Sequence, residues 1–145
     1  MKKIFTVTTA LCVYLLSTPL LSIAGDFDGS KPLVCTVISV SECLMDQGCR
    51  EVTPEEVNLP RFLWINLAKK VIQSSRSGQD ARTSKIESVK ELDHKLMLQG
   101  AEQGREDVRD GFGWTIAIMT DTGEMVLTAS GDLVGEVAFG VCTPQ

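Results

Sequence analysis

The stretch that decides the fold is residues 33–40, which read LVCTVISV. β-Branched residues dominate this stretch and no helical period runs through it, so it predicts a β-strand. The strand carries Cys35, and three further cysteines follow it at Cys43, Cys49 and Cys142. Four cysteines in a small domain are typical of a disulfide framework, and such frameworks form in oxidising compartments. The cysteines therefore predict an exported protein.

The N-terminal segment points the same way. Lys2 and Lys3 give a positive start, residues 4–21 are mostly apolar, and residues 22–24 read SIA, which supplies the small residues of a cleavage site. This is the pattern of a secretory signal peptide. We therefore expect residues 1–24 to be removed, and the mature protein to be periplasmic or secreted in a Gram-negative bacterium.

Two alternatives exist for this segment. It could stay in place as a membrane anchor, but Pro19 and several threonines leave the apolar core shorter than the roughly 20 residues that a span needs. It could belong to a lipoprotein, but Cys12 lies inside the apolar region and not at its end. Cleavage is the interpretation that the residues favour.

Residues 25–145 are predicted to form a single domain, long enough for a core but small enough to gain from disulfides. All 19 acidic residues lie in this part. Removal of Lys2 and Lys3 leaves 12 of the 14 basic residues, so the net charge is −7. An acidic domain repels nucleic acid and anionic lipid, and neither is an expected partner. No second apolar run is long enough to span a membrane, so we expect no transmembrane segment in the mature chain.

Strand-like segments recur along this domain, separated by tight turns. Beyond residues 33–40 they are 62–66, 70–73, 83–92, 95–101, 114–120, 125–129 and 134–142. Two turns are well marked, at Asp93-His94 and at residues 121–124, where Gly123 suits a left-handed conformation. The pattern predicts an all-β fold, an antiparallel meander of about eight strands that closes into a small barrel and so removes exposed edges.

One segment departs from the strand pattern. Thr53 can cap a helix, Pro54 suits the first helical position, and Glu56 completes a capping box. These residues predict one short helical turn at residues 54–57. A helix is also an alternative for residues 86–97, where Glu, Lys and Leu are frequent, but the apolar residues there do not share one helical face.

The four cysteines allow three pairings. Cys43 and Cys49 have five residues between them, including a turn glycine, so a tight turn can join them, which leaves Cys35 with Cys142. The long bridge would tie the first strand to the last, and these strands are neighbours in a closed meander. The alternatives are buried free thiols at Cys35 and Cys142, or a zinc site from Cys43, Cys49 and His94, although this cysteine gap is wider than zinc pairs usually have. We expect neither a metal nor a cofactor.

Catalytic patterns are weak in this chain. Its one histidine, His94, lies at an expected hairpin tip, where a solvated turn residue is a simpler interpretation than a general base. The serine-rich stretch 74–78 has no nucleophile-elbow pattern and fits a flexible connector better. Adjacent carboxylates lie on polar stretches, whereas glycosidases need two such groups on opposite sides of a cleft. We therefore expect no enzymatic activity.

The charged, glycine-flanked loop at residues 103–112 is the most suggestive segment for binding, because long loops on a rigid sheet often carry binding groups. Arg105 and Arg109 could grip a carboxylate or phosphate, with Asp107 and Phe112 beside them. The alternative is a soluble loop whose charges pair with one another.

Two large aromatic residues, Trp64 and Trp114, lie in predicted strands and are expected in the barrel interior, either as core or as the lining of a ligand cavity. The leading functional hypothesis is non-catalytic binding of a small ligand or of an envelope protein, since small barrels can hold one ligand. An alternative is an inhibitor of a secreted hydrolase such as lysozyme that acts through the 103–112 loop. A hydrolase is the third and weakest hypothesis.

Several short motifs suggest a relationship. They are Cys43 with Gly48-Cys49, Thr53-Pro54-Glu55, residues 58–63 (NLPRFL), residues 122–125 (TGEM) and residues 139–142 (FGVC). Together the motifs resemble those of a family of small exported bacterial proteins without assigned function. The resemblance implies a disulfide-tied, β-rich exported domain and transfers no catalytic residue. In architecture alone, the expected fold is also similar to the periplasmic lysozyme inhibitors, whose inhibitory motif has no residue-by-residue match here.

Overall fold

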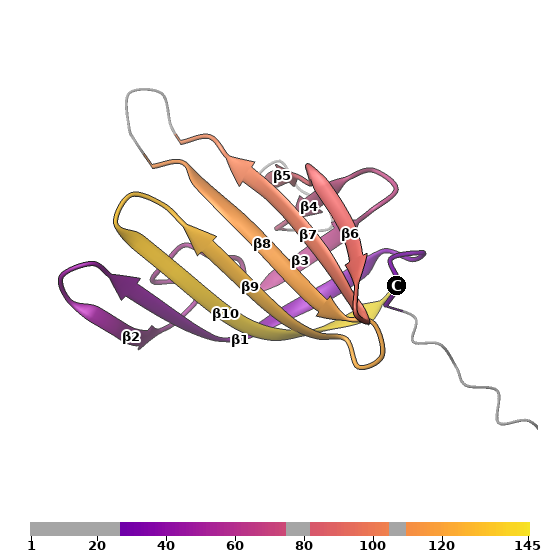
Figure 1. Ribbon diagram of the computed structural model, residues 1–145, viewed down its shortest axis with the longest axis horizontal. Coiled ribbons are helices and arrows are strands. Elements are labelled where there is room, and N and C mark those ends of the chain that lie inside the picture. Colours follow the sequence, from indigo (N-terminus) through magenta and orange to yellow (C-terminus); the bar gives the residue numbers. More distant parts are fainter. Residues whose placement is uncertain (1–26, 75–81, 105–109) are drawn as a thin grey trace, which may run out of the picture.

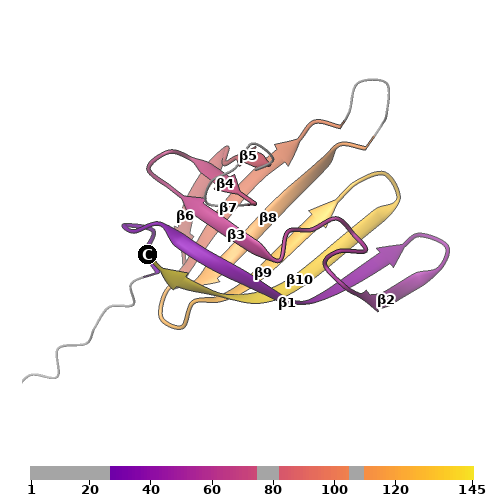
Figure 2. The ribbon, with the colours of Figure 1, turned by 180° about the vertical axis from the view of Figure 1, so that it is seen from behind.

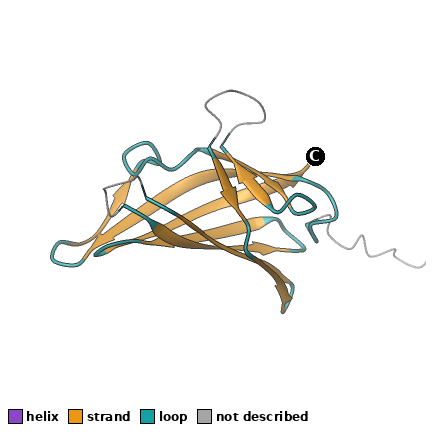
Figure 3. Ribbon diagram, turned by 90° about the horizontal axis from the view of Figure 1, so that it is seen from above, coloured by secondary structure: helices purple, strands orange, loops and turns teal. Residues whose placement is uncertain are grey.

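The protein is built from β-strands in the part that a computed structural model describes, which is residues 27–74, 82–104 and 110–145 (Figure 1). The strands are β1 (Leu33–Leu44), β2 (Gly48–Val52), β3 (Phe62–Asn66), β4 (Val71–Gln73), β5 (Thr83–Lys85), β6 (Ser88–Leu92), β7 (Lys95–Glu102), β8 (Phe112–Met119), β9 (Glu124–Ser130) and β10 (Val134–Pro144). These residues contain no helix, and hence none long and apolar enough to cross a bilayer (Figure 3). The all-β prediction is confirmed, and the helix alternative for residues 86–97 is wrong.

One antiparallel sheet contains every strand, in the order β5-β4-β3-β1-β10-β9-β8-β7-β6, with β2 paired to β1 outside this path. The first and last strands, β1 and β10, are neighbours, and the backbone N–H of Gln145 donates to the carbonyl of Pro32 over 2.9 Å just beyond them. The sheet curls strongly, so that its two halves face each other (Figures 2 and 3).

The curled sheet is an open half-barrel, and the prediction of a closed barrel is wrong. Its end strands, β5 and β6, do not pair with each other, although only Ile86 and Glu87 separate them in the chain. There the backbone changes partner, because the Ile86 N–H donates to Lys70 over 2.9 Å and the Glu87 N–H donates to Gln99 over 2.8 Å. Strands β4 and β5 have three residues each. The single strand expected at residues 83–92 is therefore two strands.

The short helical turn expected at residues 54–57 is not seen, and that part of the prediction is wrong. The capping box is present, since the Glu56 carboxylate accepts from the Thr53 N–H over 2.7 Å and Thr53 Oγ1 accepts from the Glu56 N–H over 3.3 Å. However, Asn58 already has a left-handed φ of 55°, and the Leu59 N–H bonds back five residues over 2.8 Å. That closing pattern ends helices. The start and stop signals overlap, so a compact turn forms in place of a helix.

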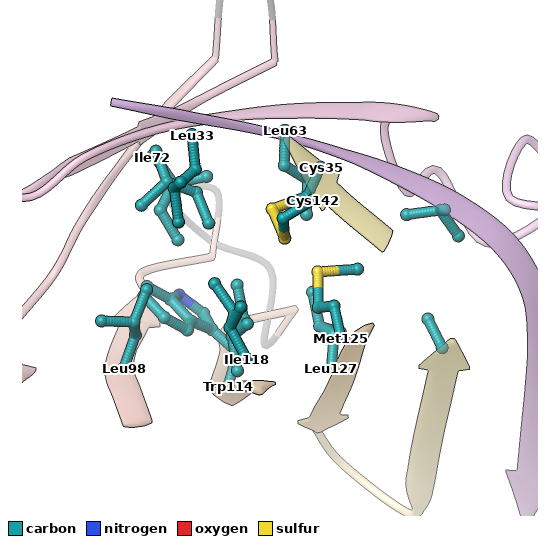
Figure 4. Packing of buried hydrophobic residues seen from close by; sticks show 14 of the residues in the cluster. Leu33, Cys35, Leu63, Ile72, Leu98, Trp114, Ile118, Met125, Leu127 and Cys142 are labelled. Atoms are coloured by element: carbon teal, nitrogen blue, oxygen red, sulfur yellow. A yellow bond between two sulfur atoms is a disulfide. The ribbon is translucent and has the colours of Figure 1, made fainter. Parts of the chain in front are cut away.

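Buried side chains alternate along β1 and fill the interior of the curl. Leu33, Cys35 and Val37 point inward. A β-bulge after Val37 then shifts the register, so that Ile38 is exposed and Val40 returns to the core. Figure 4 shows side chains of the β1 half of the sheet facing those of β7, β8 and β9 across the interior. The bulge lets one long strand keep its apolar side inward along a strongly curved path.

Two disulfides join residues that lie directly opposite each other on neighbouring strands. Cys35 and Cys142 pair in register between β1 and β10 and are buried in the core. Cys43 and Cys49 pair in register between β1 and β2, with Cys49 exposed. Both expected pairings are confirmed, and they replace the free-thiol and zinc alternatives. Two disulfides are typical of a protein that folds in an oxidising extracellular or periplasmic compartment.

Candidate ligand-binding cavity

An apolar cavity of about 430 Å³ lies inside the half-barrel. Its buried walls come from both sides of the curl, with Leu63 on β3 and Ile72 on β4 facing Trp114 and Ile116 on β8 and Leu127 on β9. Figure 4 shows four of these side chains, with Leu63 and Ile72 on the opposite side of the interior from Trp114 and Leu127. A cavity of this size with apolar walls is within the range that holds small ligands.

Trp114 forms one wall because the strand opposite it carries a glycine. Trp114 pairs with Gly100 across β8 and β7, and a Cβ atom at Gly100 would collide with the indole ring and with the Lys85 carbonyl. The ring therefore lies over Gly100 and reaches β5, where Nε1 donates to Ser84 Oγ over 3.0 Å. This contact joins strands near the two ends of the open sheet and fixes the ring beside the cavity.

The turn before β3 forms one side of the cavity mouth. Val57 and Leu59 pack against the core and line the cavity together with Asn58. The guanidinium of Arg82 donates to the Asn58 carbonyl over 2.7 Å. Arg82 is itself held to the end of β4, because its N–H donates to Ser74 Oγ over 2.9 Å and its carbonyl accepts from the Ser74 N–H over 3.0 Å. The turn that follows the capping box at Thr53 therefore forms part of the cavity mouth.

Charged side chains of the described residues surround this mouth. They are Arg82, Glu102, Asp110, Asp132 and Glu136. Four of these five described residues are acidic, and low-dielectric walls strengthen the field of charges at such a border. The cavity therefore combines an apolar interior with an acidic border.

Glu136 is half-buried on the inward side of β10, directly opposite Glu42 on β1. Burial raises the pKa of Glu136 above its ordinary value, and the nearby Glu42 carboxylate raises it further. Glu42 has a cationic partner, because the guanidinium of Arg50 on β2 lies 2.8 Å from the Glu42 carboxylate. On the other side, β9 places the apolar Ala129 beside Glu136. Among the described residues, no cation pairs with the Glu136 carboxylate.

The two predicted interior aromatics lie in different places. Trp114 is buried and lines the cavity. Trp64 lies on the other side of β3, between the inward residues Leu63 and Ile65, and its ring centroid is 6.0 Å from that of the exposed Phe62. The two tryptophans differ because Trp114 occupies an inward-facing position of β8, whereas Trp64 occupies an outward-facing position of β3.

The loop expected to bind a ligand is only partly described. Phe112, at its C-terminal end, is partly exposed and borders the cavity mouth. Arg105, Asp107 and Arg109 lie outside the described residues.

His94 is placed away from the cavity. It lies with Asp93 at the tip of the β6–β7 hairpin, where both residues have positive φ angles, 49° for Asp93 and 58° for His94. The cavity instead meets β7 at its other end, at Glu102. Within the described part of the chain, no group of three or more His, Cys, Asp or Glu residues could hold a metal ion.

Sequence reasoning missed Glu136, Ser84 and Arg82. A signal for Glu136 was present: inward residues alternate along a strand, so an inward Cys142 places Glu136 on the same side. Ser84 and Arg82 had no such signal, because their role depends on where the two ends of the sheet meet.

Apolar walls and a polar border suit the retention of a small molecule. His94, the one histidine among the described residues, precedes the start of β7, whereas Glu102 at the cavity mouth lies at the end of that strand. The resemblance suggested by the sequence motifs stays a prediction. Comparisons with models of protein families, with curated proteins and with solved structures find no match to this chain.

Proposed function

We propose that this protein is a non-catalytic binding protein that holds a small, largely apolar molecule inside its half-barrel. The observation that carries the proposal is the cavity of about 430 Å³ between the two halves of the sheet. Its walls are side chains of the hydrophobic core, so a ligand that enters exchanges water contact for apolar contact. Trp114 contributes a large flat surface and is held in place by Ser84.

The proposed location is the bacterial envelope, and specifically the periplasm of a Gram-negative cell. The disulfides fit an oxidising compartment, and the sequence pattern of residues 1–24 fits a cleaved signal peptide. In that compartment, a binding protein for apolar molecules could carry them through water.

The test uses a neutral apolar dye, N-phenylnaphthylamine, whose fluorescence rises in an apolar environment. Ala129 borders the cavity, and the Ala129→Phe variant would fill part of it. Thr128 is its exposed neighbour on the other side of β9, so Thr128→Phe is a control that introduces the same aromatic side chain outside the cavity. We expect the native protein and Thr128→Phe to bind the dye and Ala129→Phe to bind it at least tenfold more weakly.

Far-UV circular dichroism of each variant establishes that the sheet is intact. If a folded Ala129→Phe variant binds the dye as tightly as the native protein, the dye does not occupy the cavity and the proposal is wrong. Absence of dye binding by the native protein would contradict it equally. Mass spectrometry of small molecules extracted with the protein from envelope fractions would then identify the natural ligand.

A further inference from the structure

A row of three charged side chains crosses three neighbouring strands at the edge of the cavity. Glu136 on β10 lies opposite Glu42 on β1, and Glu42 lies opposite Arg50 on β2. Arg50 binds Glu42 over 2.8 Å and lies 3.8 Å from Glu56 on its other side. Its positive charge is therefore shared between two carboxylates, and neither of them is Glu136.

Glu136 has no cationic partner in the described part of the protein. None of the hydrogen bonds or ion pairs among those residues involves its carboxylate. Placing like charges directly opposite each other on antiparallel strands is destabilising. A half-buried carboxylate of this kind at the border of an apolar cavity is the arrangement that a cationic ligand group would complete.

The other charged residues at the mouth also favour a positively charged ligand group. Arg82 is the only cation that borders the cavity in the described residues, and its guanidinium already donates to the Asn58 carbonyl. Glu102 adds a second acidic side chain to Glu136 at this border. Among the described residues at the mouth, an anionic head group such as a fatty-acid carboxylate would meet the carboxylates of Glu102 and Glu136.

We propose that the ligand is an amphipathic cation, with an apolar body in the cavity and an ammonium group bound to the carboxylate of Glu136. The inference rests on the proposed binding function and adds the chemistry of the head group. Hydrogen bonds between charged partners are stronger than neutral ones. The same contact would relieve the repulsion between Glu136 and Glu42.

Proton binding would compete with this ligand. The charged groups that face Glu136 from the neighbouring strands are Glu42 on β1, with Arg50 behind it, whereas β9 contributes the apolar Ala129. Burial and Glu42 raise the pKa of Glu136, so a larger share of the free protein carries the neutral acid at mildly acidic pH. Affinity for a cation should therefore increase as the pH rises through the titration of Glu136.

The test compares three ligands that share one apolar body, namely octylammonium, octanol and octanoate, by isothermal titration calorimetry at pH 7.5. We expect octylammonium to bind about tenfold or more tightly than octanol, as for a hydrogen bond between charged groups. Octanoate should bind more weakly than octanol. On lowering the pH to 5, the advantage of octylammonium over octanol should shrink.

Two variants assign the effect to one side chain. Glu136→Gln should abolish the preference for octylammonium over octanol. Glu51→Gln removes the same charge from the exposed side of β2 and should keep the preference. A folded Glu136→Gln variant that still prefers octylammonium as strongly as the native protein would overturn the assignment.

The outcomes also separate this inference from the proposed function. If none of the three ligands, nor the neutral dye, binds to the native protein, the binding function itself fails. If octanol binds as tightly as octylammonium, the function stands and the cationic head group is wrong.

Discussion

The indole Nε1 of Trp114 donates a hydrogen bond to Ser84 Oγ over 3.0 Å, and this bond connects β8 to β5 across the side on which the sheet stays open. β5 has only three residues and follows a stretch of chain outside the described residues. The bond therefore secures a short end strand to the larger part of the sheet. It also fixes the orientation of the ring that lines the cavity.

Replacing Ser84 with alanine should loosen this connection. The indole N–H would lose its partner, and we expect the free energy of unfolding to fall by about 1 kcal/mol. Urea unfolding followed by circular dichroism measures the change. The adjacent Thr83→Ala variant, on the exposed side of β5, should have a much smaller effect. Equal losses in the two variants would show that the hydrogen bond does not stabilise the fold.

Gly100 should be much less tolerant of substitution than Gly113. A Cβ atom at Gly100 would collide with the Trp114 ring and the Lys85 carbonyl, whereas a Cβ atom at Gly113 meets nothing within 4 Å. We expect Gly100→Ala to cost about 1–3 kcal/mol, as overpacking does, and Gly113→Ala to change stability little. Thermal unfolding of the two variants gives the comparison. Unchanged stability of Gly100→Ala would mean that the ring does not lie over this glycine.

The two disulfides should contribute unequally to stability. Cys35 and Cys142 are 107 residues apart in sequence, and Cys43 and Cys49 are six apart. In the chain-entropy description, the long loop stabilises by roughly 4–5 kcal/mol and the short loop by roughly 2 kcal/mol. Guanidinium unfolding of the two double-alanine variants should show this order. The reverse order would contradict the entropic explanation for this fold.

The stability of the protein should depend on pH through Glu136. Its pKa is raised in the folded state by burial and by Glu42, so ionisation of this group opposes folding. The penalty is absent below the ordinary pKa of 4.5 and develops as the pH rises through the higher folded value. Glu136→Gln should therefore be more stable than the native protein at pH 8, and this difference should vanish near pH 4.

Urea unfolding at both pH values measures this difference, and Glu51→Gln serves as the control for a general loss of negative charge. The expectation fails if the Glu136→Gln variant is less stable than the native protein at pH 8. That result would mean that the carboxylate has a stabilising partner.

The features that sequence predicted well are those that depend on near neighbours. The β-branched run at residues 33–40 forms β1, and Asp93, His94 and Gly123 all have the left-handed conformation expected of their turns. The disulfides were also predictable, because one pair spans a tight turn and only one partner then remains for Cys35.

The features that sequence did not predict depend on where distant strands end. The backbone of Ile86 bonds to Lys70 and that of Glu87 bonds to Gln99, two residues that lie far apart in the sequence, and no local pattern shows this change. The turn after Thr53 had both a start signal and a stop signal for a helix, and the stop signal at Asn58 came too early for a helix to form. The cavity lies between the two halves of the curled sheet, which are far apart in the sequence. Ser84 and Arg82 are therefore recognisable as part of its border only in the three-dimensional structure.

The position of the Cys35–Cys142 bridge has a mechanical consequence. The register places Leu33 opposite Pro144, so the bridge lies two residues inside the end of the paired strands. A force that pulls the two ends of the domain apart could peel away only the residues before Cys35 and after Cys142, because the covalent bond then carries the load. The whole sheet between Cys35 and Cys142 is shielded from that force. In single-molecule stretching, the oxidised domain should lengthen only by the residues before Cys35 and after Cys142, and the reduced domain should unravel.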